Sequence, residues 1–122
     1  MFRSILIAAA LLAGTNVAFA DICRRSGTYH FTNSQYPMFI SIQSGATCEA
    51  TFGTFGNANF TFKRLFLVSA PARGKIRLRE GGYYIYSAPA NYTGTDEFKL
   101  RVCGTENNSE GCADLQYSVT IN

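Results

Sequence analysis

The segment EFKLRVCGTENNSEGCADLQYSVTI, residues 97–121, contains two runs in which apolar and polar side chains alternate. The runs cover residues 97–103 and 113–121, and residues 104–111 between them are rich in Gly, Asn and Ser. Alternation with a period of two is typical of a strand with one buried face, and Gly, Asn and Ser favour turns. The segment therefore predicts two antiparallel strands joined by a turn. Their expected buried side chains are Phe98, Leu100, Val102, Leu115, Tyr117, Val119 and Ile121.

Short runs of β-prone residues recur through the preceding chain, and no stretch has a sustained helical period of apolar residues. A loop is expected at residues 53–59 and a tight hairpin turn at residues 80–82. Seven or eight short strands in about 100 residues predict an all-β protein with two packed antiparallel sheets. The other expected strands are residues 28–32, 38–42, 46–52, 60–69, 75–79 and 83–87. The other expected core residues are Phe39, Leu65, Leu67, Ile76, Leu78 and Ile85.

The first twenty residues have the pattern of a secretory signal peptide. Arg3 precedes an apolar run at residues 5–14, and Ala18-Phe19-Ala20 is a small-x-small cleavage site. The apolar run is shorter than the ~20 residues that cross a bilayer. We expect cleavage after Ala20, which leaves residues 21–122 as one domain without a transmembrane segment. This mature form is expected to be secreted or periplasmic.

All four cysteines follow the predicted signal peptide, and an even number in a small exported domain predicts two disulfides. Three pairings are possible. We favour Cys103–Cys112, because turn residues fill the segment between them, and this leaves Cys23–Cys48 as the second pair. Clustered ligands for zinc are absent from the sequence, which has a single histidine, His30, so neither a metal site nor a cofactor is expected.

The C-terminal half contains a second, more specific pattern. SAP (69–71), GKI (74–76) and NYTGTDEF (91–98) occur in this order and precede an alternating strand. Over residues 68–122 the chain resembles the bacterial Ig-like and cadherin-like repeat domains of exported proteins. The resemblance implies an immunoglobulin-like β-sandwich for the mature chain, in which Gly94 adopts a positive φ and Asp96 accepts hydrogen bonds from nearby backbone amides.

Domains of this family usually serve as adhesive or spacer modules in tandem arrays, sometimes with calcium between the repeats. This chain has one copy of the pattern. Its eight acidic residues include no D-x-D or D-x-N cluster that could supply six to eight oxygen ligands, so calcium is not expected.

Basic residues are concentrated in one part of the chain. After removal of Arg3 with the signal peptide, ten basic residues stand against eight acidic ones, a net charge of +2. Residues 63–79 nevertheless contain six basic residues and no acidic one. Four of the six alternate with smaller or apolar residues, so a strand would present them in one row on its solvent face. This basic row consists of Arg73, Lys75, Arg77 and Arg79, and Tyr84 and Tyr86 on the next strand are expected to lie beside it.

Two interpretations of the basic row stay open. Its charges could serve only to discourage edge-to-edge aggregation of a solvated strand. Alternatively, the row is a binding face for an anionic partner of the cell envelope, such as lipopolysaccharide, an acidic polysaccharide or an acidic protein surface. Nucleic acid is not expected as a partner because of the export signal.

Catalysis is not expected from this sequence. A catalytic triad would need His30 as its base, and no nucleophile motif accompanies it. Asp96 and Glu97 are adjacent, so in a strand they point to opposite faces and cannot form a glycosidase pair. We expect a small exported, non-enzymatic Ig-like module with a binding or structural role. The alternative is a hydrolase or inhibitor that acts on an envelope component through its loops.

Overall fold

The computed structural model describes residues 22–52 and 59–122. The signal peptide predicted at residues 1–20 and nearly all of the loop predicted at residues 53–59 lie outside the described residues. The described part of the chain contains eight strands and no helix. The strands are β1 (Cys23–Ser26), β2 (Ser34–Ile42), β3 (Thr47–Thr51), β4 (Phe60–Ser69), β5 (Lys75–Arg79), β6 (Tyr83–Ser87), β7 (Gly94–Glu106) and β8 (Ser109–Ile121).

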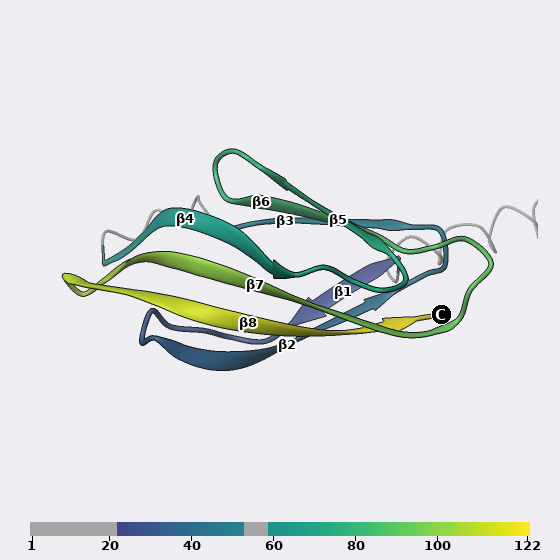
Figure 1. The fold of residues 1–122 in the computed structure, drawn as a ribbon, viewed down its shortest axis with the longest axis horizontal. Helices are drawn as coiled ribbons and strands as arrows, with labels where there is room; N and C mark the ends of the chain where they lie inside the picture. Colours follow the sequence, from purple (N-terminus) through teal and green to yellow (C-terminus); the bar gives the residue numbers. More distant parts are fainter. Residues whose placement is uncertain (1–21, 53–58) are drawn as a thin grey trace, which may run out of the picture.

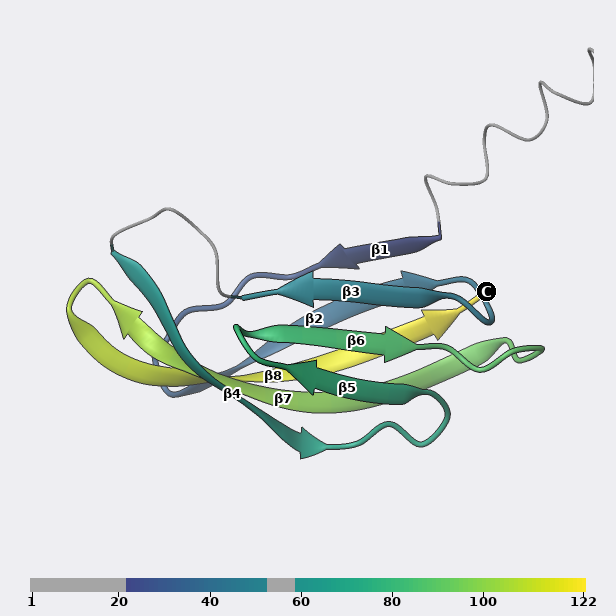
Figure 2. The ribbon, with the colours of Figure 1, turned by 90° about the horizontal axis from the view of Figure 1, so that it is seen from above.

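The strands form two sheets that face each other, as in a β-sandwich (Figure 1). The larger sheet has five strands in the order β1-β2-β8-β7-β4, and the smaller sheet has three in the order β3-β6-β5. In Figure 2 the smaller sheet lies over the middle of the larger one, with β1 close to β3 and β4 running obliquely past β5. The predicted all-β architecture with two sheets is confirmed.

The prediction that both sheets are entirely antiparallel is wrong. β2 and β8 run parallel, in a register that extends from Ser34 opposite Ala113 to Ile42 opposite Ile121, whereas all other neighbouring pairs are antiparallel. Side chains alternate with the same period in parallel and antiparallel strands. The sequence pattern therefore identifies both strands but cannot show their relative direction.

The strand predicted at residues 28–32 is wrong, because residues 27–30 have no regular structure and β1 lies before them. The backbone N–H of Phe31 donates to Glu106 Oε1 at 3.0 Å instead of to a neighbouring strand. The buried Phe31 ring stacks on Phe60, with ring centroids 4.5 Å apart, and Tyr29 packs against both. The aromatic residues that suggested a strand here are thus packing residues of an irregular segment.

The predicted bounds of β4, β5 and β6 are confirmed, but β7 and β8 are longer than predicted. Only Asn107 and Asn108, with φ of 51° and 68°, form the turn between them. Gly104 and Gly111 lie within the strands. A Cβ on Gly104 would come within 2.0 Å of the Thr61 carbonyl oxygen, so this glycine permits a close approach of β4 rather than a turn.

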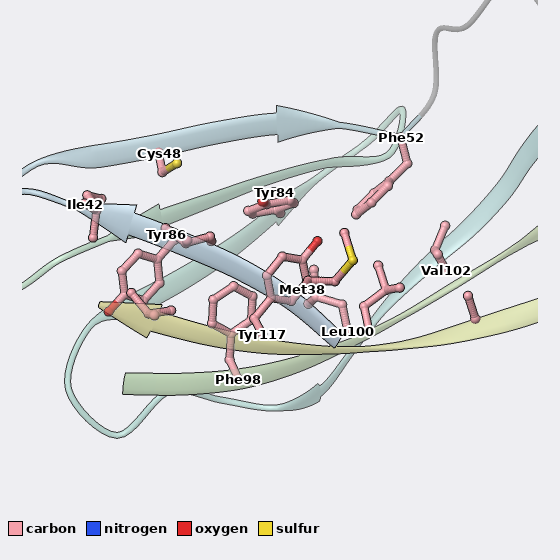
Figure 3. Close-up of a cluster of buried hydrophobic side chains, with 14 of the residues drawn as sticks. Met38, Ile42, Cys48, Phe52, Tyr84, Tyr86, Phe98, Leu100, Val102 and Tyr117 are labelled. Atoms are coloured by element: carbon pink, nitrogen blue, oxygen red, sulfur yellow. The ribbon is translucent and has the colours of Figure 1, made fainter. Parts of the chain in front are cut away.

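The core lies between the two sheets and is centred on aromatic rings from three strands (Figure 3). Phe98 stacks on Tyr117 with ring centroids 4.5 Å apart and on Tyr86 with centroids 5.4 Å apart, and Tyr84 packs against the edge of Tyr117. All seven core residues predicted for β7 and β8 are buried, which confirms that part of the pattern. These residues are Phe98, Leu100, Val102, Leu115, Tyr117, Val119 and Ile121.

The other core predictions have mixed outcomes. Leu65, Ile76 and Leu78 are partly buried and pack against the core. Phe39 and Leu67 are wrong as core residues, because their side chains are 49% and 42% exposed. The remaining residue, Ile85, is buried but does not belong to the core cluster.

Geometry explains these exceptions. Phe39 lies opposite Ser118 on the outer face of the larger sheet, and Leu67 lies on β4, at the edge of that sheet. Ile85 lies between Glu49 and Arg77 in the register, so it is on the outer face of the smaller sheet. A period of two predicts which residues share a face, but not which face is covered.

Both predicted disulfides are present, Cys23–Cys48 and Cys103–Cys112. The first joins β1 in the larger sheet to β3 in the smaller one, and the second joins directly opposite residues of β7 and β8. Disulfides persist in oxidising compartments, so the pair indicates an oxidising environment for this protein.

Candidate functional site

The basic row follows β5, which is an edge strand of the smaller sheet. Ile76 and Leu78 point toward the core, so Lys75, Arg77 and Arg79 point to the outer face, as strand alternation requires. All three cations are exposed. Arg73, the fourth residue of the predicted basic row, precedes β5 and is also exposed.

Asp96 holds the turn from which β5 starts. Its Oδ1 accepts hydrogen bonds from the backbone N–H groups of Ala72 at 3.1 Å and Arg73 at 3.2 Å, and its Oδ2 accepts one from the N–H of Gly74 at 2.8 Å. The Tyr86 hydroxyl donates to Oδ2 at 2.7 Å. Asp96 is therefore a structural anchor for the basic row, as the expectation of bonds to backbone amides implies.

The electrostatics of Asp96 follow from these contacts. Burial alone would raise the pKa of Asp96, but the hydrogen bonds from Gly74, Tyr86 and Arg73 outweigh burial and hold the pKa below its usual value. Burial and the adjacent carboxylate together raise the pKa of Tyr86. Asp96 is thus an ionised carboxylate that accepts a hydrogen bond, and Tyr86 is a neutral phenol that donates it.

Tyr84 and Tyr86 do not lie beside the basic row, contrary to the sequence prediction. Tyr86 is opposite Ile76 and Tyr84 is opposite Leu78, so both rings are on the buried face, with exposed fractions of 0% and 2%. Directly opposite residues of two paired strands share a face. Counting the register through the turn at residues 80–82 would have shown that Tyr83, and not Tyr84, pairs with Arg79.

Some cations of the row already have partners. Arg79 Nη1 lies 3.7 Å from Glu49 Oε2 on β3, and its guanidinium carbon lies 5.4 Å from the centre of the Tyr83 ring. The Arg73 guanidinium lies 5.1 Å from the centre of the Tyr92 ring. Among the described residues, Lys75 and Arg77 form no ion pair. The middle of the row therefore carries charge that described acids do not neutralise.

Two of the six basic residues in segment 63–79 belong to the other sheet. Lys63 and Arg64 lie on β4, at the edge of the larger sheet. Lys63 Nζ lies 3.2 Å from Glu110 Oε1, and the Arg64 guanidinium lies 6.0 Å from the centre of the Phe66 ring. The basic residues of segment 63–79 are thus divided between β4, at the edge of the larger sheet, and the region of β5, at the edge of the smaller sheet.

His30 forms an exposed structural contact. Its Nδ1 lies 2.7 Å from Glu106 Oε2, and the other oxygen of this carboxylate accepts the Phe31 N–H. The hydrogen bonds from Phe31 and His30 lower the pKa of Glu106. Glu106 thus fixes residues 30–31 against β7. Within residues 22–52 and 59–122, no group of three or more His, Cys, Asp or Glu side chains could hold a metal ion.

Comparison with known proteins leaves the site without a precedent: no family model and no curated protein matches the chain. In the part of the chain that the structure describes, no helix is long and apolar enough to cross a membrane.

Proposed function

We propose that the chain is a small exported, non-enzymatic module with an immunoglobulin-like β-sandwich that binds an anionic partner of the cell envelope. The basic row is the proposed binding face. The observation that supports it is the exposed position of Lys75 and Arg77 on an edge strand, without an ion pair to any described acid.

The strand order supports the Ig-like part of the proposal. In an Ig constant-type sandwich, strands A, B, E and D form one sheet and C, F and G the other. When β3 to β8 are taken as B, C, D, E, F and G in chain order, the smaller sheet has the order B-E-D and the larger sheet contains G-F-C. β1 and β2 depart from this pattern, because β2 pairs with the strand in the place of G and β1 pairs with β2.

Export is supported by two independent features. The N-terminal twenty residues match a signal peptide, and two disulfides persist best in the periplasm or outside the cell. The positions of the disulfides differ from antibody domains, where one bridge links strands B and F across the sheets.

Binding by the basic row would be electrostatic. An anionic polysaccharide or lipopolysaccharide headgroup presents repeated charges, and a row of cations along one strand can contact several of them. Exposed charges are screened by salt, so binding is expected to weaken as ionic strength rises. The turn held by Asp96 fixes the start of the row, which reduces the ordering required when the partner binds.

The test compares the exported, disulfide-bonded protein with Lys75→Glu/Arg77→Glu on immobilised heparin and on lipopolysaccharide. We expect the variant to bind at least about tenfold more weakly at low salt, since each reversed cation removes a favourable contact and adds a repulsive one, worth roughly 1 kcal/mol each.

A matched control separates local charge from net charge. Arg77→Glu and Lys99→Glu both change the net charge by two units, but Lys99 lies on the outer face of the other sheet, on β7. Arg77→Glu should weaken retention much more than Lys99→Glu. Equal retention of the wild type and the double variant would show that the row is only a solvated face.

A further inference from the structure

The edge strand β4 has features that the proposed function does not use. Among the described residues, β4 pairs with β7 alone, so its other edge has no strand beside it. It also carries three consecutive exposed apolar side chains. Phe66 is 45% exposed, Leu67 42% and Val68 51%. A long apolar edge strand is a template for pairing with another chain.

The directions of the β4 backbone groups can be derived from the hydrogen bonds of Cys112 on β8, because β7 lies between β8 and β4 and pairs with both. The Cys112 N–H donates to Asn33 Oδ1 at 2.9 Å, and its carbonyl oxygen accepts the Asn33 N–H at 2.7 Å. Both groups therefore point away from β7, which makes Cys103 and Cys112 a non-hydrogen-bonded pair. The backbone groups of Cys103 must then point to its partner on β4, Arg64.

Alternation along β4 completes the assignment. Arg64 and Phe66 bond to β7, whereas the backbone N–H and carbonyl groups of Leu65 and Leu67 point to the free edge. Register shifts occur between Phe62 and Arg64 and after Leu67, so the pattern is regular within residues 64–67. Two donors and two acceptors are thus positioned for an added strand.

A groove lies along this edge, lined by residues of β4, of β5 and of the turn that follows β5. Its volume is about 400 Å³. Apolar side chains line it from both sheets, and three cations and one carboxylate stand around it. The apolar residues are Phe62, Leu65, Phe66 and Leu78, and the charged residues are Lys63, Arg64, Arg79 and Glu80. The groove is therefore apolar in its lining and net positive at its border.

We propose that the free edge of β4 binds an extended segment of a partner protein as an added strand, and that this segment alternates acidic and apolar residues. Main-chain hydrogen bonds to Leu65 and Leu67 would supply affinity, and the groove would select the side chains. Apolar side chains of the segment would face the groove, and the acids that alternate with them would lie on the outer face of the larger sheet, where Arg64 is exposed. This surface shares Arg79 with the end of the basic row, but it does not include Lys75 or Arg77.

Charge favours an acidic partner over a second copy of this chain. A second copy would bring its own net positive groove border, which contains Lys63, Arg64 and Arg79, toward the same border of this chain, whereas an acidic segment complements that charge. A polysaccharide is also unsuitable for this edge, because it has no regular series of backbone amides to pair with Leu65 and Leu67.

The test uses a capped ten-residue peptide of alternating Glu and Val, and measures amide hydrogen exchange by NMR on the exported, disulfide-bonded protein. With nine-tenths of the protein occupied, exchange at Leu65 and Leu67 should slow about tenfold, because only the free tenth exchanges. Phe66, already bonded to β7, should change little. Saturating peptide without slower exchange at Leu65 and Leu67 would overturn the proposal.

Two controls separate strand addition from charge attraction. The same peptide with an N-methyl group on every residue keeps its charges but loses its main-chain donors on both edges, and should give no protection. Heparin should bind without slowing exchange at Leu65 and Leu67. If heparin protected these amides equally, strand addition would be excluded while the proposed function stood. If heparin did not bind but the peptide still protected Leu65 and Leu67, only the proposed function would be refuted.

A pair of variants tests the position. Leu67→Glu places a carboxylate at the free edge and should weaken the peptide at least about tenfold, through lost apolar contact and charge repulsion. Phe39→Glu makes a similar change at an exposed apolar residue of β2, which is paired on both sides by β1 and β8. It should bind the peptide as the wild type does. Equal loss in both variants would contradict the assigned edge.

Discussion

Asp96 is the residue on which the geometry of the basic row most depends. Its carboxylate is buried and accepts four backbone N–H groups and the Tyr86 hydroxyl. The turn that it holds also requires Gly74, since a Cβ there would lie 2.5 Å from both the Ser87 carbonyl oxygen and the Tyr86 hydroxyl oxygen. One carboxylate and one glycine thus fix the path by which the chain enters β5.

We predict that Asp96→Asn lowers the free energy of unfolding by about 3 kcal/mol near neutral pH, because an amide leaves buried donors unsatisfied and loses the charge that strengthens their bonds. The folded pKa of Asp96 is lowered, so its stabilisation is complete above the unfolded value of ~3.9 and is lost as pH falls through the folded value. Urea unfolding from about pH 7 to about pH 2 should show the gap between wild type and variant closing at the acid end.

Asp114→Asn is the control, because its ion pair with Arg101, 2.7 Å long, is about half exposed. Such pairs contribute roughly 0–1 kcal/mol. An Asp96→Asn variant as stable as Asp114→Asn at neutral pH would be inconsistent with the anchoring role of Asp96.

Among the elements, the β7–β8 hairpin shows both the strength and the limit of sequence analysis. Its alternation correctly predicts the seven core residues, because burial of one face leaves a local pattern. Gly104 and Gly111 suggest a turn from composition, yet they lie in strands. What they accommodate, the backbone of β4 and of Phe31, is far away in sequence and leaves no local signal. The irregular path of residues 27–30 was missed for the same reason, since it depends on Glu106.

Gly111→Ala should test this explanation. The added Cβ would lie 2.3 Å from the Phe31 carbonyl oxygen, so the segment around Phe31 has to move and the bonds between Asn33 and Cys112 weaken. We expect a loss of about 1–3 kcal/mol and a melting temperature lower by about 5–15 °C in thermal unfolding. An unchanged melting temperature would show that the close approach is not required.

The candidate site was partly predictable from the sequence. Alternation along β5 shows correctly that its cations share one face, since that needs only a strand. The placement of Tyr84 and Tyr86 failed because it requires the register of the hairpin. The edge of β4 was missed altogether, because edge and centre strands differ in their neighbours, which are set by the order of the sheets.

In the molecule as a whole, the two disulfides close chain segments of different length. Cys103 and Cys112 are nine positions apart in sequence and lie in one hairpin. Cys23 and Cys48 are 25 positions apart, and their disulfide joins β1 of the larger sheet to β3 of the smaller one. In the chain-entropy model the longer loop gives the larger stabilisation, about 3.5 against about 2.7 kcal/mol.

The paired variants Cys23→Ala/Cys48→Ala and Cys103→Ala/Cys112→Ala should therefore differ in urea unfolding. We expect the first to lose more free energy of unfolding, by about 1 kcal/mol, since β7 and β8 remain adjacent through their turn without a bridge. The reverse order would mean that the hairpin bridge stabilises the fold beyond its effect on chain entropy.

The parallel pairing of β2 with β8 has a consequence for folding kinetics. It brings together residues 79 positions apart, such as Ser34 and Ala113, and it places β8 between β2 and β7. Contacts so distant in sequence raise the relative contact order, and all-β proteins of this kind fold in milliseconds to seconds. Until β8 docks, β2 and β7 cannot complete the larger sheet. Because β8 is the last strand to be synthesised, the larger sheet of a chain with this connectivity can be completed only after the whole domain has been made.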